Sequence, residues 1–160
     1  MAGVVVCPTS LREFTAEVLV KVGMPAEDAA LVADTLVTAD VRGVSSHGIV
    51  RLPFYVNKMK LGGTKARPQI QVIQEGPSSA LVNGGNGMGQ VVASYAMNLA
   101  IKKAKETGVA LVGVRASEHF GAAAYYNIIN GFKHKRFYAI RSVLHGSLGI
   151  APGGLGFPET

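Results

Sequence analysis

The chain of 160 residues lacks several features that secreted and membrane-spanning proteins need. Its one cysteine, Cys7, cannot form an internal disulfide, which excludes a secreted disulfide scaffold and is typical of a reducing compartment. No run approaches the roughly 20 apolar residues that cross a bilayer, and the N-terminal "MAGVVVCPTS" has no basic n-region of the kind found in signal peptides. We therefore expect a cytoplasmic protein with no membrane partner.

Tryptophan is absent as well, and charged residues make up only 16% of the chain, against 48% hydrophobic residues. This composition excludes a disordered chain, and the apolar residues are sufficient to form the hydrophobic core of about one ordinary domain. The net charge of +6 would suit an anionic partner. However, the sequence shows no basic patch interleaved with aromatic residues and no known nucleic-acid-binding motif, so we expect no nucleic-acid partner.

The N-terminal part of the chain has helical patterns. "SLREF", from Ser10, has the spacing of a capping box and predicts a helix that ends at Gly23. A second helix is predicted over residues 25–43, because apolar residues recur there at helical spacing. A third helix over about 47–61 is expected to be interrupted near Pro53.

The periodicity changes after the loop "LGGTKARP". "QIQVIQE" (69–75) alternates polar and apolar residues, as a half-buried strand does, and "ALVNGG" (80–85) predicts a second strand. A helix is expected over 90–107, ending in lysines and a glycine cap. The continuous apolar run "VALVGVRA" (109–116) predicts a strand at the centre of a sheet.

These patterns predict an α/β (α+β) fold. Residues 1–66 form an N-terminal helical segment that carries a polar motif, and residues 67–130 form a mixed β/α sheet domain. Residues 131–160 differ, since they hold 4 Lys or Arg and 1 acidic residue, whereas residues 1–130 hold 12 and 9. We therefore treat the last 30 residues as a divergent basic tail.

The segment "GGNGMGQ" (84–90) looks like a phosphate-binding loop, but it has neither the G-x-G-x-x-G spacing nor a G-K-[ST] ending. We interpret its glycines mainly as a strand-to-helix turn, because glycine readily adopts positive φ. A backbone anion site at the start of the following helix stays open as an alternative.

The stretch "SSHGIVRLPFY" places His47, Arg51 and Tyr55 four residues apart, which is one face of a continuous helix. An imidazole exchanges protons near neutral pH, and a guanidinium is the best partner for a substrate carboxylate. The combination suits a small 2-hydroxy or 2-oxo acid. The alternative is a solvated helix face in which His47 is a cap and Arg51 meets surface acids.

A second histidine, His119, lies in "SEHFG", just beyond the predicted strand at 109–116. Loops that follow strand ends often hold functional residues in α/β proteins, although a surface histidine without a function is equally compatible with the sequence. The remaining histidines, His134 and His145, lie in the basic tail and receive no role. We predict no metal site.

Two long stretches, "DVRGVSSHGIVRLPFYVNKMKLGG" and "NGGNGMGQVVASYAMNLAIKKAKETGVALVGVRASEHFGAAAYY", resemble the malate/L-lactate dehydrogenase family. This family includes sulfolactate, ureidoglycolate and Δ1-piperideine-2-carboxylate enzymes and is distinct from the Rossmann-type lactate and malate dehydrogenases. The resemblance runs from about residue 11 to residue 129 and rests on "SHGIVRLPFY" and "HFGAAAYY".

The resemblance implies an oxidoreductase that uses NAD or NADP to interconvert a 2-hydroxy acid and its 2-oxo acid. The catalytic serine and histidine of the family fall on Ser46 and His47, and its proton acceptor falls on His119. Its substrate-binding arginine and tyrosine fall on Arg51 and Tyr55. Family members are usually homodimers with an unusual cofactor domain, which implies the same for this chain.

Family chains are longer and continue with further strands and a "GTNP"-like motif that helps to hold the cofactor. From residue 131 this sequence departs from that pattern, and "APGG" (151–154) is only a partial match. We therefore expect a truncated family domain in which no cofactor-binding residue can be assigned. Two functions follow as alternatives: a dehydrogenase, or a catalytically silent fragment that acts as a dimerising or regulatory module.

Overall fold

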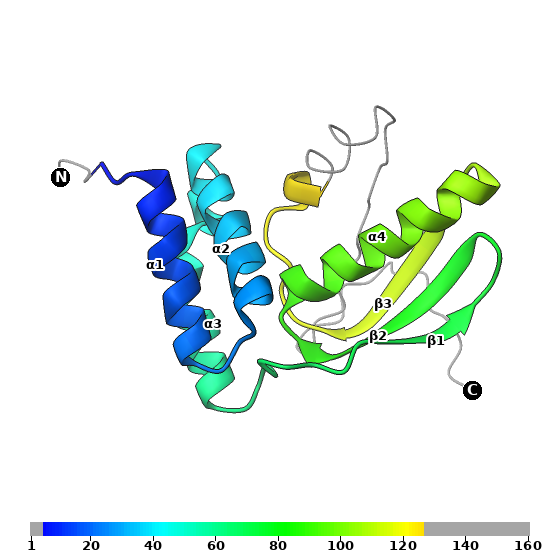
Figure 1. Cartoon of the computed structure of the whole chain (residues 1–160), viewed down its shortest axis with the longest axis horizontal. Helices are drawn as coiled ribbons and strands as arrows, with labels where there is room; N and C mark the ends of the chain where they lie inside the picture. Colours follow the sequence, from blue (N-terminus) through cyan, green and yellow to red (C-terminus); the bar gives the residue numbers. More distant parts are fainter. Residues whose placement is uncertain (1–4, 127–160) are drawn as a thin grey trace, which may run out of the picture.

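The computed structural model of the protein describes residues 5–126, which form two adjoining parts (Figure 1). Three helices, α1, α2 and α3, make up a helical unit at the N-terminal end. A three-stranded sheet with the long helix α4 makes up the second part. The loop that follows the last strand returns between the two parts, so residues far apart in the sequence meet at their junction (Figure 1).

The first two helices are α1 (Pro8–Lys21) and α2 (Ala26–Val41), which pack against each other. The predicted capping box at Ser10 was wrong, because α1 begins two residues earlier and its N-cap, Cys7, makes no side-chain hydrogen bond. Proline is tolerated there, since the first N–H groups of a helix have no intrahelical acceptor. The second helix was predicted correctly, and Pro25 is its N-cap.

The third predicted helix is divided into short pieces. Two 3₁₀ turns, η1 (Ser45–His47) and η2 (Ile49–Arg51), precede α3 (Leu52–Lys60). The break falls at Gly48, whose backbone is extended, and not at Pro53, which lies in the first turn of α3 where proline fits. The expectation that positions 47, 51 and 55 share one face of a continuous helix was therefore wrong.

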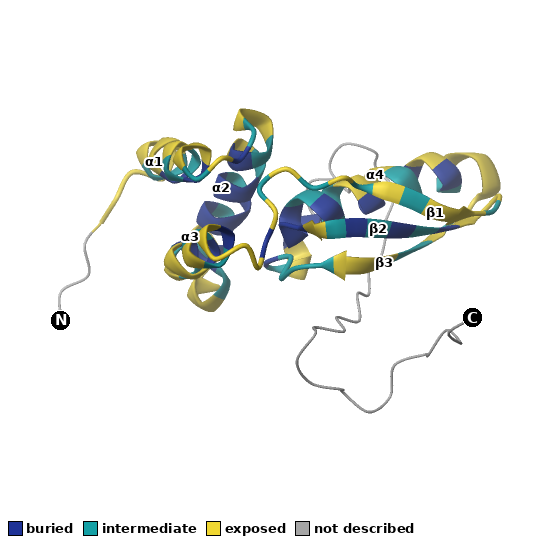
Figure 2. Cartoon of the chain, turned by 90° about the horizontal axis from the view of Figure 1, so that it is seen from below, coloured by how far each residue is buried: buried dark blue, intermediate teal, exposed yellow. Residues whose placement is uncertain are grey.

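The sheet contains β1 (Gln71–Glu75), β2 (Ser79–Gly87) and β3 (Leu111–Ser117) in the order β1-β2-β3. The first pair is antiparallel and the second is parallel, and the crossover between β2 and β3 is α4 (Gly89–Thr107). Helix α4 covers one face of the sheet, while β1 and β3 show exposed residues (Figure 2). Among the described residues β3 is an edge strand, and the central position predicted for it stays a prediction.

Helix α4 matches its predicted limits to within one residue and ends at Gly108, which adopts the left-handed conformation with φ +83°. Its buried face includes Met97 and Ile101, whereas Tyr95 is exposed. Lys103 is buried as well, because its ammonium donates to the carbonyl oxygen of Gly76 at 2.7 Å.

The principal hydrophobic core lies within the helical unit and extends to the start of α4. Its buried members come from all three helices and from the residue before α4: Leu19, Met24, Ala29, Val32, Leu36, Leu52, Tyr55, Met59 and Met88. Because Met88 belongs to this core, the N-terminal end of α4 is held against α3. The core therefore fixes the junction between the two parts of the molecule.

The structure confirms the predicted α/β (α+β) class, with helices first and a small mixed sheet after them. No helix within residues 5–126 is long and apolar enough to cross a membrane. The predicted tail at 131–160, with His134 and His145, lies outside the described residues.

A substitution at Leu36 tests the assignment of the hydrophobic core, because this side chain of α2 is fully buried. We expect Leu36→Ala to lower the free energy of unfolding by about 2–5 kcal/mol, since it removes buried apolar atoms and leaves a cavity. Urea unfolding followed by circular dichroism measures this change. Val20→Ala on the exposed side of α1 is the control, and equal losses in the two variants would contradict the assignment of the core.

Candidate functional site

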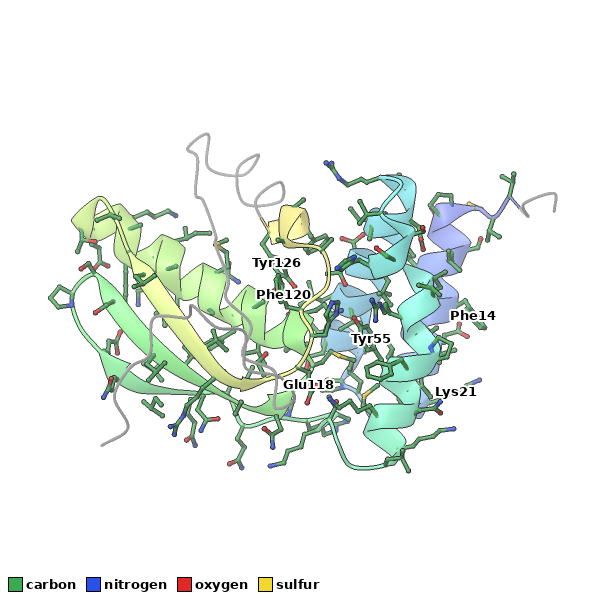
Figure 3. The ribbon with its side chains drawn as sticks, turned by 180° about the vertical axis from the view of Figure 1, so that it is seen from behind. Phe14, Lys21, Tyr55, Glu118, Phe120 and Tyr126 are labelled. Carbon is green, nitrogen blue, oxygen red and sulfur yellow. The ribbon has the colours of Figure 1, made fainter. Side chains whose placement is uncertain are left out.

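The predicted polar residues meet at the junction of the two parts. His119 lies two residues beyond β3, and its ring centroid is 5.4 Å from that of His47. Together with Arg51 and Tyr55 these residues form what we call the histidine cluster. Figure 3 shows Tyr55 of α3 facing the loop that carries Glu118 and Phe120.

Two groups hold the ring of His119 through one nitrogen. The hydroxyl of Tyr55 lies 2.8 Å from Nδ1, and the backbone N–H of Gly121 donates to the same atom at 3.3 Å. No residue within 5–126 hydrogen-bonds to Nε2. The second ring nitrogen is therefore the one that can meet a small ligand.

Tyr55 is buried between α3 and α4, with 3% of its surface exposed. The side-chain amide of Gln90, fully buried in the first turn of α4, donates to the Tyr55 hydroxyl at 3.2 Å. Burial raises the pKa of Tyr55, and the hydrogen bond from Gln90 and the charge of Arg51 oppose that shift only in part. Tyr55 therefore stays an uncharged phenol at neutral pH.

His47 is oriented from the other side by its own 3₁₀ turn. The Ser46 hydroxyl lies 2.9 Å from His47 Nδ1, and Arg51 Nε donates to the Ser46 carbonyl oxygen at 2.7 Å. Within residues 5–126, the terminal nitrogens of Arg51 have no side-chain partner. The guanidinium thus stabilises the turn through Nε, and its two terminal nitrogens remain available to bind a ligand.

Asp40, in the last turn of α2, hydrogen-bonds to the start of η2. Its Oδ2 atom accepts the backbone N–H of Ile49 at 2.7 Å. A Cβ atom on Gly48 would lie 1.9 Å from Asp40 Oδ1, so only glycine fits against this carboxylate. The break that separates η1 from η2 is therefore fixed by a contact between α2 and the turn.

The glycine-rich segment at 84–90 serves the junction by close backbone approach. A Cβ on Gly89 would lie 2.1 Å from the carbonyl oxygen of Glu118, and one on Gly84 would lie 2.8 Å from that of Ala116. Gly85 has φ +60°, which favours glycine as well. Gly84 and Gly85 lie within β2 and Gly89 begins α4, so the strand passes into the helix only at the end of this segment, and the predicted turn is confirmed for that end alone.

An ion pair between Lys58 and Glu118 joins α3 to the loop that carries His119. Both side chains are partly exposed, so solvent screens the pair and we assign its main effect to geometry. Because Glu118 is paired with Lys58, it does not pair with Arg51. Among the described residues Arg51 has no ion-pair partner.

The electrostatic setting lowers the pKa of His119. Burial disfavours its charged form most, and the nearby Arg51 and His47 add to that effect. An anion at Arg51 would reverse part of this shift by supplying the missing negative charge. The cluster is thus suited to bind a carboxylate and to hold or release one proton beside it.

A separate cavity of about 700 Å³ lies between the start of α2 and α4. Its lining includes Asp28, Arg67, Tyr95 and Tyr125, and none of the histidine cluster. No group of three or more His, Cys, Asp or Glu side chains that could hold a metal ion occurs within residues 5–126.

Sequence patterns alone missed several residues that build the junction, namely Asp40, Lys58, Gln90 and Glu118. Their contacts span between 9 and 60 residues of sequence, so no local spacing reveals them. One signal was visible: Gln90 is an uncharged polar residue at the end of the glycine-rich segment and at the start of the helix predicted over 90–107. A buried polar side chain needs a partner, which would have directed attention to it.

Gly48 tests the contact with Asp40. We expect Gly48→Ala to lower the free energy of unfolding by about 1–3 kcal/mol, because the methyl group overlaps the carboxylate and displaces the turn. Gly113→Ala is the matched control, since its Cβ would meet the end of the Leu81 side chain at 3.2 Å. Urea denaturation of both variants gives the comparison, and a Gly48 variant as stable as its control would refute the contact.

The lowered pKa of His119 predicts a dependence of stability on pH. Above about pH 6.5 the imidazole is neutral in both folded and unfolded chains and contributes no difference. As pH falls below that value the unfolded chain takes up the proton first, so the free energy of unfolding decreases until the folded pKa is reached. Urea denaturation between pH 8 and pH 5 should show a smaller decrease for His119→Gln, and identical profiles would contradict the shift.

Most of the chain is similar to known proteins in sequence and in fold. Residues 6–128 match the family model described as malate/L-lactate dehydrogenase. The chain is 53% identical over 119 residues to a malate dehydrogenase from Pyrococcus horikoshii, which covers 74% of this chain and 33% of that protein. It is 46% identical over 120 residues to an L-sulfolactate dehydrogenase from Methanocaldococcus jannaschii, covering 75% and 35%. The chain thus spans about a third of the length of these curated relatives.

A more distant relative is a ureidoglycolate dehydrogenase (NAD(+)) of Escherichia coli, 40% identical over 117 residues, which are 73% of this chain and 34% of that protein. Among solved structures, the malate dehydrogenase of Pyrococcus horikoshii superposes with a TM-score of 0.79 at 49% identity, over 81% of this chain and 37% of the other. Because the family model covers most of the chain and the folds agree, the chain belongs to the malate/L-lactate dehydrogenase family.

Proposed function

We propose that this chain carries the acid-binding part of a malate/L-lactate-type dehydrogenase, which interconverts a 2-hydroxy acid and its 2-oxo acid. The observation that carries the proposal is the pair of imidazoles 5.4 Å apart beside a guanidinium with a free fork. Such a pair can face the oxygen on C2 of the substrate while the arginine holds the adjoining carboxylate.

Arg51 binds the substrate carboxylate in this proposal. Its Nε atom is fixed to the Ser46 carbonyl oxygen, so the remaining nitrogens point in a constant direction. A planar fork of this kind pairs with both carboxylate oxygens, which fixes the C1–C2 bond of the acid relative to the imidazoles. Tyr55, which the resemblance places at the substrate, has its hydroxyl on His119 and also orients that ring.

His119 exchanges the proton at Nε2. During reduction doubly protonated His119 gives its Nε2 proton to the oxygen, and during oxidation the neutral form that carries its proton on Nδ1 accepts the C2 hydroxyl proton at Nε2. The ring is half-buried and its other nitrogen is anchored, which keeps Nε2 in one place. His47, oriented by Ser46, donates a hydrogen bond to the same oxygen and stabilises the charge that develops there.

A nicotinamide cofactor, NAD or NADP, supplies or accepts the hydride when it is bound. At Gly84, Gly87 and Gly89 the glycine-rich segment packs closely against protein atoms on the side where a Cβ would lie, and no contact among the described residues identifies a site for the cofactor phosphates. We therefore assign no cofactor-binding residue. Homodimer formation, implied by the resemblance, stays a prediction.

The alternative function belongs to another class. In that case the chain is a catalytically silent module of the family that dimerises or regulates. It would keep the acid-binding residues, because all four members of the histidine cluster lie within residues 5–126.

Turnover separates the two functions. Purified chain is titrated with NADH and NADPH by cofactor fluorescence and is then assayed with oxaloacetate and pyruvate. For the enzyme we expect saturable binding, and His119→Ala or His47→Ala should reduce turnover by roughly 10²–10⁴, the usual scale for a positioned acid or base. Lys60→Ala on the exposed side of α3 is the control.

Two results would contradict this proposal. Absence of cofactor binding and turnover in the wild-type chain would favour the silent module. A loss below about threefold at both histidines, with turnover intact, would remove their assigned roles, because a positioned acid or base contributes at least about 10²-fold.

A further inference from the structure

One buried polar atom at the junction has no partner within the described residues. It is Oε1 of Gln90, whose side chain is fully buried in the first turn of α4. Leaving a buried acceptor unpaired lowers the stability of the folded chain. Such a group in a functional region calls for an explanation, and the neighbours of Gln90 supply one.

The other end of the amide belongs to a chain of hydrogen bonds. Gln90 Nε2 donates to the Tyr55 hydroxyl at 3.2 Å, and that hydroxyl lies 2.8 Å from His119 Nδ1. The Tyr55 oxygen accepts a hydrogen bond from Gln90, and its own O–H is available to donate to Nδ1. The backbone N–H of Gly121 points at the same atom. In this arrangement Nδ1 only accepts, so neutral His119 carries its proton on Nε2.

When the proton lies on Nδ1 of His119 instead, the unpaired Oε1 of Gln90 gains a partner. When His119 is protonated, Nδ1 holds a proton and donates to the Tyr55 oxygen, so the Tyr55 O–H must find another acceptor. Rotation of the Gln90 amide would present Oε1 to that hydroxyl at the place where Nε2 now lies. An amide has a donor and an acceptor at similar reach, which leucine, methionine or glutamate does not have.

We propose that Gln90 is a positioning residue for His119: through the Tyr55 hydroxyl, its amide sets which ring nitrogen carries the proton. The inference rests on the proposed function only in taking His119 as the proton-exchanging group. With Nε2 of the amide on Tyr55, His119 presents an N–H to a 2-oxo acid. With Oε1 on Tyr55, His119 can hold a proton on Nδ1 and accept the proton of a 2-hydroxy acid at Nε2.

Other charged groups near His119 affect the pKa of its ring, but they do not determine which ring nitrogen carries the proton of the neutral form. Arg51 in η2 and His47 in η1 lie on the ligand side, and both disfavour a positive charge on His119. The ion pair of Lys58 with Glu118 flanks the loop and is neutral as a unit. Neither Arg51 nor His47 hydrogen-bonds to Nδ1, which is left to Tyr55 and Gly121.

The experiment is nitrogen-15 NMR of the histidine side chains in the full 160-residue chain, because long-range proton–nitrogen correlations identify the protonated ring nitrogen. At pH 8 we expect His119 in the Nε2–H form. Gln90→Glu, which offers only acceptors when ionised, should shift His119 toward the Nδ1–H form. Gln90→Met, of similar length and without hydrogen bonds, should lower the midpoint of the His119 titration, since the charged form loses its acceptor.

The two Gln90 variants should differ in the His119 midpoint by about one pH unit, a tenfold change in proton affinity. In a Tyr55→Phe background this difference should fall to less than half, because the connecting hydroxyl is gone. Gln74→Met on β1, an exposed position, controls for general effects of the substitution. Amide spectra of each variant establish that it is folded.

An Nδ1–H form in the wild-type chain at pH 8 would overturn the proposal without any variant. Equal midpoints in the two Gln90 variants, or an undiminished difference in the Tyr55→Phe background, would overturn it as well. These readouts need no turnover. A chain that shows the expected nitrogen spectra but no dehydrogenase activity would keep this inference and reject the proposed enzyme.

Discussion

The structure of the site depends on the hydrogen bond between Tyr55 and His119, which joins residues 64 positions apart in the sequence. It brings the loop after β3 onto the helical unit, and the pair of Lys58 and Glu118 supports it a short distance away. Tyr55 can form this bond because the core that includes Met88 holds α3 against the start of α4. The apolar packing thus fixes the distance at which two polar groups meet.

Close packing at the junction restricts which residues are possible there. Gly48 packs against the Asp40 carboxylate and Gly89 packs against the Glu118 carbonyl, so a Cβ at either position would overlap protein atoms. Gln90 is buried beside them with one polar atom unpaired, which is a cost in stability that an apolar residue would avoid. Features of this kind gather where a chemical role, and not packing, has selected the residue.

Local patterns predicted the elements of this fold well and their pairing poorly. The helix at 90–107 and its cap at Gly108 followed from periodicity, whereas the apolar run at 109–116 suggested a central strand and forms an edge strand among the described residues. The helix expected through His47 is broken at Gly48, because the Asp40 carboxylate takes the Ile49 N–H that a continuous helix would use internally. That competition involves an element nine residues away and leaves no local signal.

By itself, the sequence determined the helix and strand order, the residue types of the site and the family resemblance, because each depends on neighbours along the chain. Only the tertiary structure decided that His47 and His119 face each other, that Arg51 keeps its terminal nitrogens free, and that Gln90 contacts Tyr55. The physical reason is that hydrogen bonds and core contacts act through space. Their partners are set by how α2, α3 and α4 pack, which no single segment encodes.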